Sequence, residues 1–336
     1  MGLSDDNRIN TDLPMPALYV LDGKGSARRI ERDEIRAWQP RSHTIWIHLD
    51  RATTESQRWL KVEAGLPAVV VEALLADASR PRFVRHEQGF LLNCRGVNLN
   101  PGTDPDDMVA IKIWAEPGRI ITTRHRYLLA IQDVREDLEA EKLNGPSTVG
   151  DLVVAIADRL LHRMGPTLTK LEEEIADIEV DVMETARPER ETHVKLSKLR
   201  IQAIGLRRYL SPQRQVFSQL QAVDSPLVDD DNLIQFRELG DRLMRIVEDL
   251  DAARERASVI QDDITQRLSE RMERVTLVLT VVAAIFLPLG LLTGLLGINT
   301  AGIPGTEQDW AFGAVVAVLL VVALGLVGIF RKAGML

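Results

Sequence analysis

The chain has very little cysteine, and this excludes two kinds of structural feature. Cys94 is the single cysteine among 336 residues, so no internal disulfide bond and no zinc site built from several thiolates is expected. We predict that Cys94 is a small buried residue in a strand. The six histidines are scattered without an H-x-H or H-x3-H pair, so no local zinc motif is visible and no metal ligands are assigned.

An excess of positive charge is also missing. The formal net charge is -8, which makes nucleic acid an unexpected partner. The sequence contains no GxGxxG fingerprint, no Walker A loop and no nucleophile elbow. Because no catalytic constellation is present, we do not expect an enzyme.

Charged residues are absent from two long stretches near the C-terminal end. No charge occurs between Arg274 and Glu307, and residues 275–296 and 310–330 are both apolar. Each stretch has about 20 residues, the length that crosses roughly 30 Å of hydrocarbon. Because two such runs joined by a short loop are rare in soluble cores, the sequence predicts two transmembrane helices.

The charges beside these runs predict their orientation. The basic residues that flank the spans are Arg267, Arg271, Arg274, Arg331 and Lys332. The connecting loop, 297–309, contains neither Lys nor Arg. The positive-inside rule therefore places the N-terminus and the tail, 331–336, in the cytoplasm, and the loop outside. We expect a multi-pass protein of a bacterial-type inner (plasma) membrane, with Trp310 as an interfacial anchor.

The first part of the chain, 1–127, is predicted to be a cytoplasmic α/β domain. Short strands are expected at 17–22, 44–50 and 89–99, and a hairpin at 108–124 with Pro117-Gly118 in its turn. Helical stretches lie between these strands, so we predict a mixed sheet.

The second part, 128–231, reads as a cytoplasmic helical region. One helix is predicted at 149–184, bent at Pro166, and another at 189–222, interrupted near Pro212.

A long stalk helix is predicted at 232–296, with the first span as its end. From Phe236 to Leu268 its apolar residues recur in steps of three and four. Such a heptad stripe is typical of a coiled coil, which would assist assembly.

One face of the first span carries residues that are mostly small. At helical spacing, this face consists of Thr276, Thr280, Ala283, Leu287, Gly290 and Gly294. Small residues suit either a close helix–helix contact or the wall of a water-lined pore. In the second case several copies must surround one axis, because two helices cannot enclose a pore. Neither span contains an ionisable residue, so a transported ion would pass at least partly hydrated.

The end of the first span carries a tripeptide that points to a family. Gly297-Ile298-Asn299, in this two-span architecture, resembles the CorA-type divalent metal ion transporter superfamily, which has Gly-Met-Asn there. The variant with Ile298 and the following Gly302-Ile303-Pro304-Gly305 look most like the ZntB zinc transporter branch.

This resemblance implies a funnel-shaped homopentamer in which the first span lines the pore and the second span faces membrane lipid. It also implies that Gly297, Ile298 and Asn299 form a selectivity loop, where the Asn299 amide contacts the water shell of a cation. Glu307 and Asp309 would then raise the cation concentration at the entrance, although they also fit ordinary solvated loop acids.

The function expected from these features is transport of divalent metal cations. Zn²⁺ is the cargo that the ZntB-like features favour, with the proton coupling that this branch implies, and no cofactor is expected besides the transported ion. One alternative is a Mg²⁺, Co²⁺ or Ni²⁺ channel of the CorA type. Another is a non-conducting two-span membrane receptor or scaffold.

Overall fold

The structure is a computed structural model. It describes residues 16–31, 34–35, 43–77, 80–87, 89–140, 145–184, 190–297, 308 and 310–334. The chain forms two compact units, Met1–Ile260 and Gln261–Leu336. Helix α8 (Asp230–Leu296) begins in the first unit and ends in the second.

The first unit contains a seven-stranded sheet with the order β2-β1-β3-β7-β6-β5-β4. Its strands are β1 (Ala17–Leu21), β2 (Ala27–Arg29), β3 (Ile45–Asp50), β4 (Arg82–His86), β5 (Gly89–Gly96), β6 (Val109–Glu116) and β7 (Arg119–Arg124). Strands β3 and β7 pair in parallel, whereas the other neighbours are antiparallel. The predicted mixed sheet is therefore confirmed.

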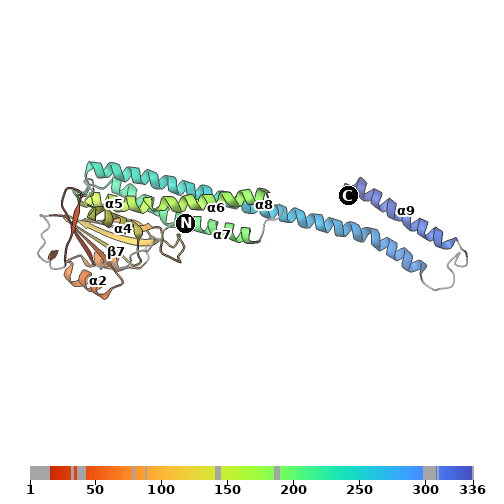
Figure 1. Ribbon diagram of the computed structural model, residues 1–336, viewed down its shortest axis with the longest axis horizontal. Coiled ribbons are helices and arrows are strands. Elements are labelled where there is room, and N and C mark those ends of the chain that lie inside the picture. Colours follow the sequence, from red (N-terminus) through yellow and green to blue (C-terminus); the bar gives the residue numbers. More distant parts are fainter. Residues whose placement is uncertain are drawn as a thin grey trace, which may run out of the picture. The chain divides into compact units, whose positions relative to one another are not determined.

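Helices cover both faces of this sheet (Figure 1). On one face, the buried side chains of Trp114, Ile47 and Leu74 belong to a core that includes α2 (Thr54–Arg58), η1 (Trp59–Glu63) and α3 (Ala68–Leu75). On the other face lie α4 (Leu129–Glu139), α5 (Val149–His162) and α7 (Arg190–Gln221). There the Tyr19 hydroxyl donates to Glu139 at 2.6 Å and links β1 to α4.

The predicted strands are confirmed, and two further strands appear. Strands β2 and β4 lie at the two edges of the sheet and were not predicted. In the β6–β7 hairpin, Gly118 has a φ of 73°, as the third position of the predicted type II turn requires. Cys94 is buried in β5, and burial raises the pKa of its thiol to about 12.

The rest of the first unit is a bundle made of α5, α6 (Met164–Glu184), α7 and the first part of α8 (Figure 1). The predicted bend at Pro166 is replaced by a break between α5 and α6 at Arg163. Pro166 then lies in the first turn of α6, where a missing N–H breaks no intrahelical bond. The predicted interruption near Pro212 is wrong, because α7 continues through it. Leu210, before the proline, and Phe217, after it, are both buried and hold the helix in place.

The heptad stripe of α8 packs inside this bundle. From Phe236 to Ile260 every apolar position of the stripe is buried within the single chain. Polar contacts join the same part of α8 to its neighbours: Arg242 pairs with Asp158 of α5 at 3.1 Å, and Arg207 of α7 pairs with Asp251 at 2.6 Å. The prediction that this segment forms a coiled coil between copies is therefore wrong, because the chain's own helices already cover the stripe.

Candidate functional site

In the part of the chain that the structure describes, two helices are long and apolar enough to cross a membrane: the end of α8 and α9 (Ala311–Lys332). Only 6% of the most apolar window of α8 and none of that of α9 is buried inside the chain. A core helix of a soluble protein would be mostly buried, so the exposure favours a membrane environment. Helix α8 stays continuous through Pro288, as predicted.

The predicted pore-lining residues lie on a single face of α8. Thr276, Thr280, Ala283, Leu287, Gly290 and Gly294 are all exposed in the single chain. A Cβ atom built on Gly290 or Gly294 would meet no atom within 4 Å, so the described chain leaves this face uncovered.

The polarity of this face is modest. The Thr280 hydroxyl donates to the carbonyl of Thr276 at 2.8 Å, which satisfies its only proton inside the helix. The hydroxyl oxygen still has a lone pair that can accept a hydrogen bond from water. The face therefore offers weak acceptors and no charge, a surface along which a hydrated cation can move without being held.

The predicted selectivity loop is described only at its first residue. The Gly297 N–H donates to the carbonyl of Thr293 at 2.9 Å and ends α8. Ile298, Asn299, Glu307 and Asp309 lie outside the described residues, so their roles stay predictions.

The charged residues before the first span pair less than their spacing predicts. Arg267 pairs with Asp263 at 2.9 Å, one turn away. In the described ranges, Arg271 and Arg274 form no ion pair, although Glu270 and Glu273 are interleaved with them. Glu270 instead accepts a hydrogen bond from Gln266 at 3.0 Å. An ion pair therefore forms at only one of these three described arginines.

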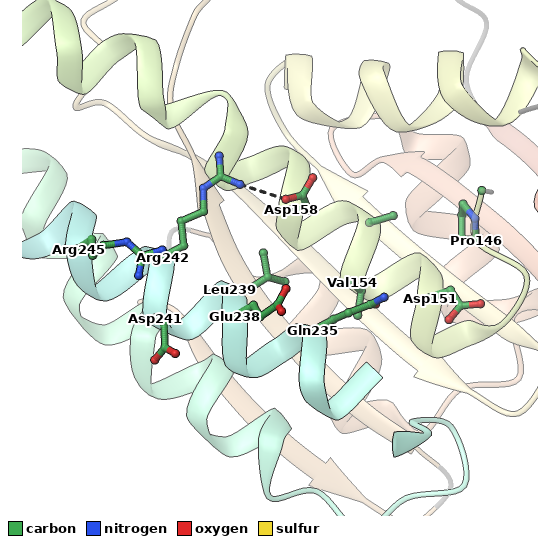
Figure 2. Close-up of a pocket in the computed structure, with 12 residues that line it drawn as sticks. Pro146, Asp151, Val154, Asp158, Gln235, Glu238, Leu239, Asp241, Arg242 and Arg245 are labelled. Atoms are coloured by element: carbon green, nitrogen blue, oxygen red, sulfur yellow. Dashed lines mark hydrogen bonds and ion pairs between the residues drawn. The ribbon is translucent and has the colours of Figure 1, made fainter. Parts of the chain in front are cut away.

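The first unit also contains a pocket of about 870 Å³ between α5 and α8 (Figure 2). Its polar lining comprises Asp151, Asp158, Gln235, Glu238, Asp241, Arg242 and Arg245. Arg242 reaches across the pocket to Asp158, as the dashed line in Figure 2 shows. This contact spans the two helices and holds one of the four carboxylates that line the pocket.

Asp151 also has a structural role. It closes a capping box with Thr148 at the start of α5 and accepts a hydrogen bond from Asn232 of α8 at 2.8 Å. Burial acts to raise the pKa of Asp151, but hydrogen bonds from Asn232, Ser147 and Thr148 outweigh it and hold the pKa below its usual value.

The acids of this pocket do not converge on one point. Across the part of the chain that the structure describes, no group of three or more His, Cys, Asp or Glu residues has the geometry to hold a metal ion. Asp151 accepts a hydrogen bond from Asn232, and Asp158 forms an ion pair with Arg242. These polar contacts join α5 to α8 beside the pocket.

Comparisons with known proteins identify relatives along nearly the whole chain. The family described as CorA-like Mg²⁺ transporter protein matches residues 41–332. The divalent cation transporter CmaX of Pseudomonas aeruginosa is 39% identical over 299 residues, 88% of each chain. The zinc transport protein ZntB of Pectobacterium atrosepticum is 38% identical over 308 residues, 91% of each chain. The solved structure of full-length CmaX has a TM-score of 0.82, with 94% of this chain and 96% of that chain covered, at 37% identity.

Proposed function

Because the chain belongs to the family of CorA-like Mg²⁺ transporter proteins, we propose that it transports divalent metal cations across a membrane and that Zn²⁺ is its main cargo. The resemblance predicted from Gly297-Ile298-Asn299 is thereby confirmed. The observation that carries the proposal is identity of 38–39% over most of the chain to a zinc transport protein and a divalent cation transporter. A transporter family also gives no reason to propose an enzyme.

The proposed ion path runs along the small-residue face of α8. Among the described residues, one chain supplies two helices of membrane-spanning length, and two helices cannot surround a pore. If the face from Thr276 to Gly294 borders the ion path, other copies of the chain must complete the wall around that path. We propose a homo-oligomer, a pentamer as the family resemblance implies, in which this face surrounds the axis and α9 faces lipid.

The chemistry of the path favours a hydrated ion. No Asp, Glu, Lys, Arg or His lies between Val275 and Leu296 or between Trp310 and Phe330. A bare divalent cation would find no compensating charge there. Asn299 is proposed to contact the hydration shell at the outer mouth, and Glu307 and Asp309 to concentrate cations before entry.

The proposed orientation places both termini in the cytoplasm of a bacterial-type inner membrane. Basic residues stand just before the first span and just after the second, and the loop 297–309 that joins the spans has neither Lys nor Arg. Both observations support this orientation. The ion would then enter at the loop or leave there, according to the direction of transport.

The test is uptake of Zn²⁺ into liposomes that contain the purified protein and a zinc-sensitive dye, with and without a pH gradient. We expect zinc flux that increases with the gradient. Magnesium flux without zinc flux would instead favour a CorA-type channel. No flux of either ion from a stable oligomer would favour a non-conducting receptor and contradict the transport proposal.

A further inference from the structure

Four basic side chains stand next to the two apolar spans. Arg271 and Arg274 precede the span of α8, and Arg331 and Lys332 end α9. All four are exposed, and none forms an ion pair within the portion of the chain that is described.

Several arginines elsewhere in the chain are held by carboxylates. Arg126 forms a two-pronged pair with Asp107, one contact being 3.0 Å, and Arg163 donates to Asp133 at 2.7 Å. Even Arg267, one turn before Arg271, pairs with Asp263. Arg271 and Arg274 differ from these arginines in that the apolar span begins directly after them.

The arginines also lie on a defined side of α8. At about 100° per residue, Arg267, Arg271 and Arg274 fall within a sector of roughly 60°. The small residues from Thr276 to Gly294 are centred roughly 180° away from this sector by the same count. If the small residues face the ion path, these arginines point away from it, where their charge does not repel a passing cation.

We propose that Arg271 and Arg274, together with Arg331 and Lys332, bind the phosphate groups of anionic phospholipids in the cytoplasmic leaflet. The apolar span begins at Val275, directly after Arg274, so the guanidinium groups lie at the depth of the lipid headgroups. A guanidinium group forms two parallel hydrogen bonds to a phosphate, which suits a headgroup site. This inference rests on the orientation in the proposed function.

The test is lipid retention by the full-length protein. Purified protein in mild detergent is incubated with equal amounts of phosphatidylglycerol and phosphatidylcholine, and the lipid retained per subunit is measured by native mass spectrometry. The wild type is expected to retain phosphatidylglycerol preferentially. In R271Q/R274Q this retention should fall on the order of twenty-fold, from the loss of two surface attractions. R271K/R274K keeps the charge and should retain most of the lipid.

A matched control removes two charges with the same spacing from the other unit. Arg58 and Lys61 are exposed near the sheet, and R58Q/K61Q should leave lipid retention unchanged. Equal retention by R271Q/R274Q and the wild type overturns the proposal, as does a wild type that does not distinguish the two lipids. Loss of the oligomer with normal lipid retention would assign the arginines to a contact between copies and also overturn it. Zinc flux is measured separately, so a failed transport assay leaves the lipid result standing.

Discussion

Lys112 is a buried cation in the middle of the sheet, and its titration should be visible in the stability of the protein. The residue is 3% exposed, and its Nζ atom donates to the carbonyl of Ala73 at 2.7 Å and to that of Ala76. These carbonyls lie at the C-terminal end of α3, which attracts positive charge. Burial nevertheless lowers the pKa of Lys112 from 10.5 to about 8, with smaller contributions from Arg51 and Arg82.

The sign and size of the effect follow from this shift. Below pH 8 both the folded and the unfolded chain carry the proton, and the folded state bears the full cost of the buried charge. Between pH 8 and pH 10.5 the unfolded chain binds more protons, so the free energy of unfolding rises with pH. Over the whole window the gain is about 3 kcal/mol, at about 1.4 kcal/mol per pKa unit.

The assay compares the melting temperature of the wild type with that of Lys112→Met from pH 7.5 to pH 10.5. Other lysines and tyrosines titrate in both proteins, so the difference between them isolates Lys112. We expect the wild type to gain roughly 6–12 °C relative to the variant across this window. Lys61→Met, at an exposed position, should run parallel to the wild type. Parallel curves for the wild type and Lys112→Met would refute the reasoning.

Three further predictions concern the ion path and the helical bundle. Asn299→Ala should reduce zinc flux into liposomes by tenfold or so, about 1.4 kcal/mol, while leaving the oligomer intact on size exclusion; normal flux would remove the amide from the mechanism. Ala283→Leu should abolish flux by filling the axis, whereas Val282→Leu, on another side of α8, should conduct normally; similar flux in both would show that the inward face is misassigned. Arg242→Ala and Asp158→Asn should show a coupling free energy below about 1 kcal/mol in a double-mutant cycle of unfolding, because both side chains are more than a third exposed. A larger coupling free energy would mean that water screens this ion pair less than the exposure of its side chains indicates.

The sequence predicts the central strands of the sheet but not its edges. Strands β3, β6 and β7 are rich in β-branched and aromatic residues, and most of their side chains are buried. Strand β4 contains Arg82, Arg85 and His86 and exposes much of its length, so its residue types resemble those of a loop. Its main chain nevertheless pairs with β5. Because main-chain hydrogen bonds do not depend on apolar side chains, an edge strand of this kind shows no hydrophobic pattern in the sequence.

The two prolines in α6 and α7 do not bend or break these helices. A proline breaks a helix only where its missing N–H and its ring disturb the preceding turn. Pro166 stands too early in α6 to do so, and around Pro212 buried side chains keep α7 continuous. Gln213, beside this proline, is buried and accepts a hydrogen bond from the Arg95 N–H of β5 at 2.7 Å. Such long-range contacts cannot be read from local sequence.

Periodicity on α8 identifies two faces, but not what covers them. The stripe from Phe236 to Ile260 has the spacing of a coiled coil, and its partner is the chain's own bundle. The stripe from Thr276 to Gly294 has similar spacing, and the described chain leaves it open. A periodic pattern states only that a face is unlike its neighbours; the partner depends on which other elements reach it.

The open stripe extends beyond the membrane span in a way that favours a pore over a dry helix contact. Toward the N-terminus from Thr276, at helical spacing, the same face of α8 carries Met272, Ser269, Thr265 and Asp262, all exposed. A close contact between membrane helices would gain nothing from a charged residue at its end, whereas an aqueous path for a cation would. Because Arg267, Arg271 and Arg274 lie on the opposite face, the side of α8 that carries the small residues has no basic residue between Asp262 and Gly294. This separation is what a helix requires when one side borders a cation path and the other an anionic lipid surface.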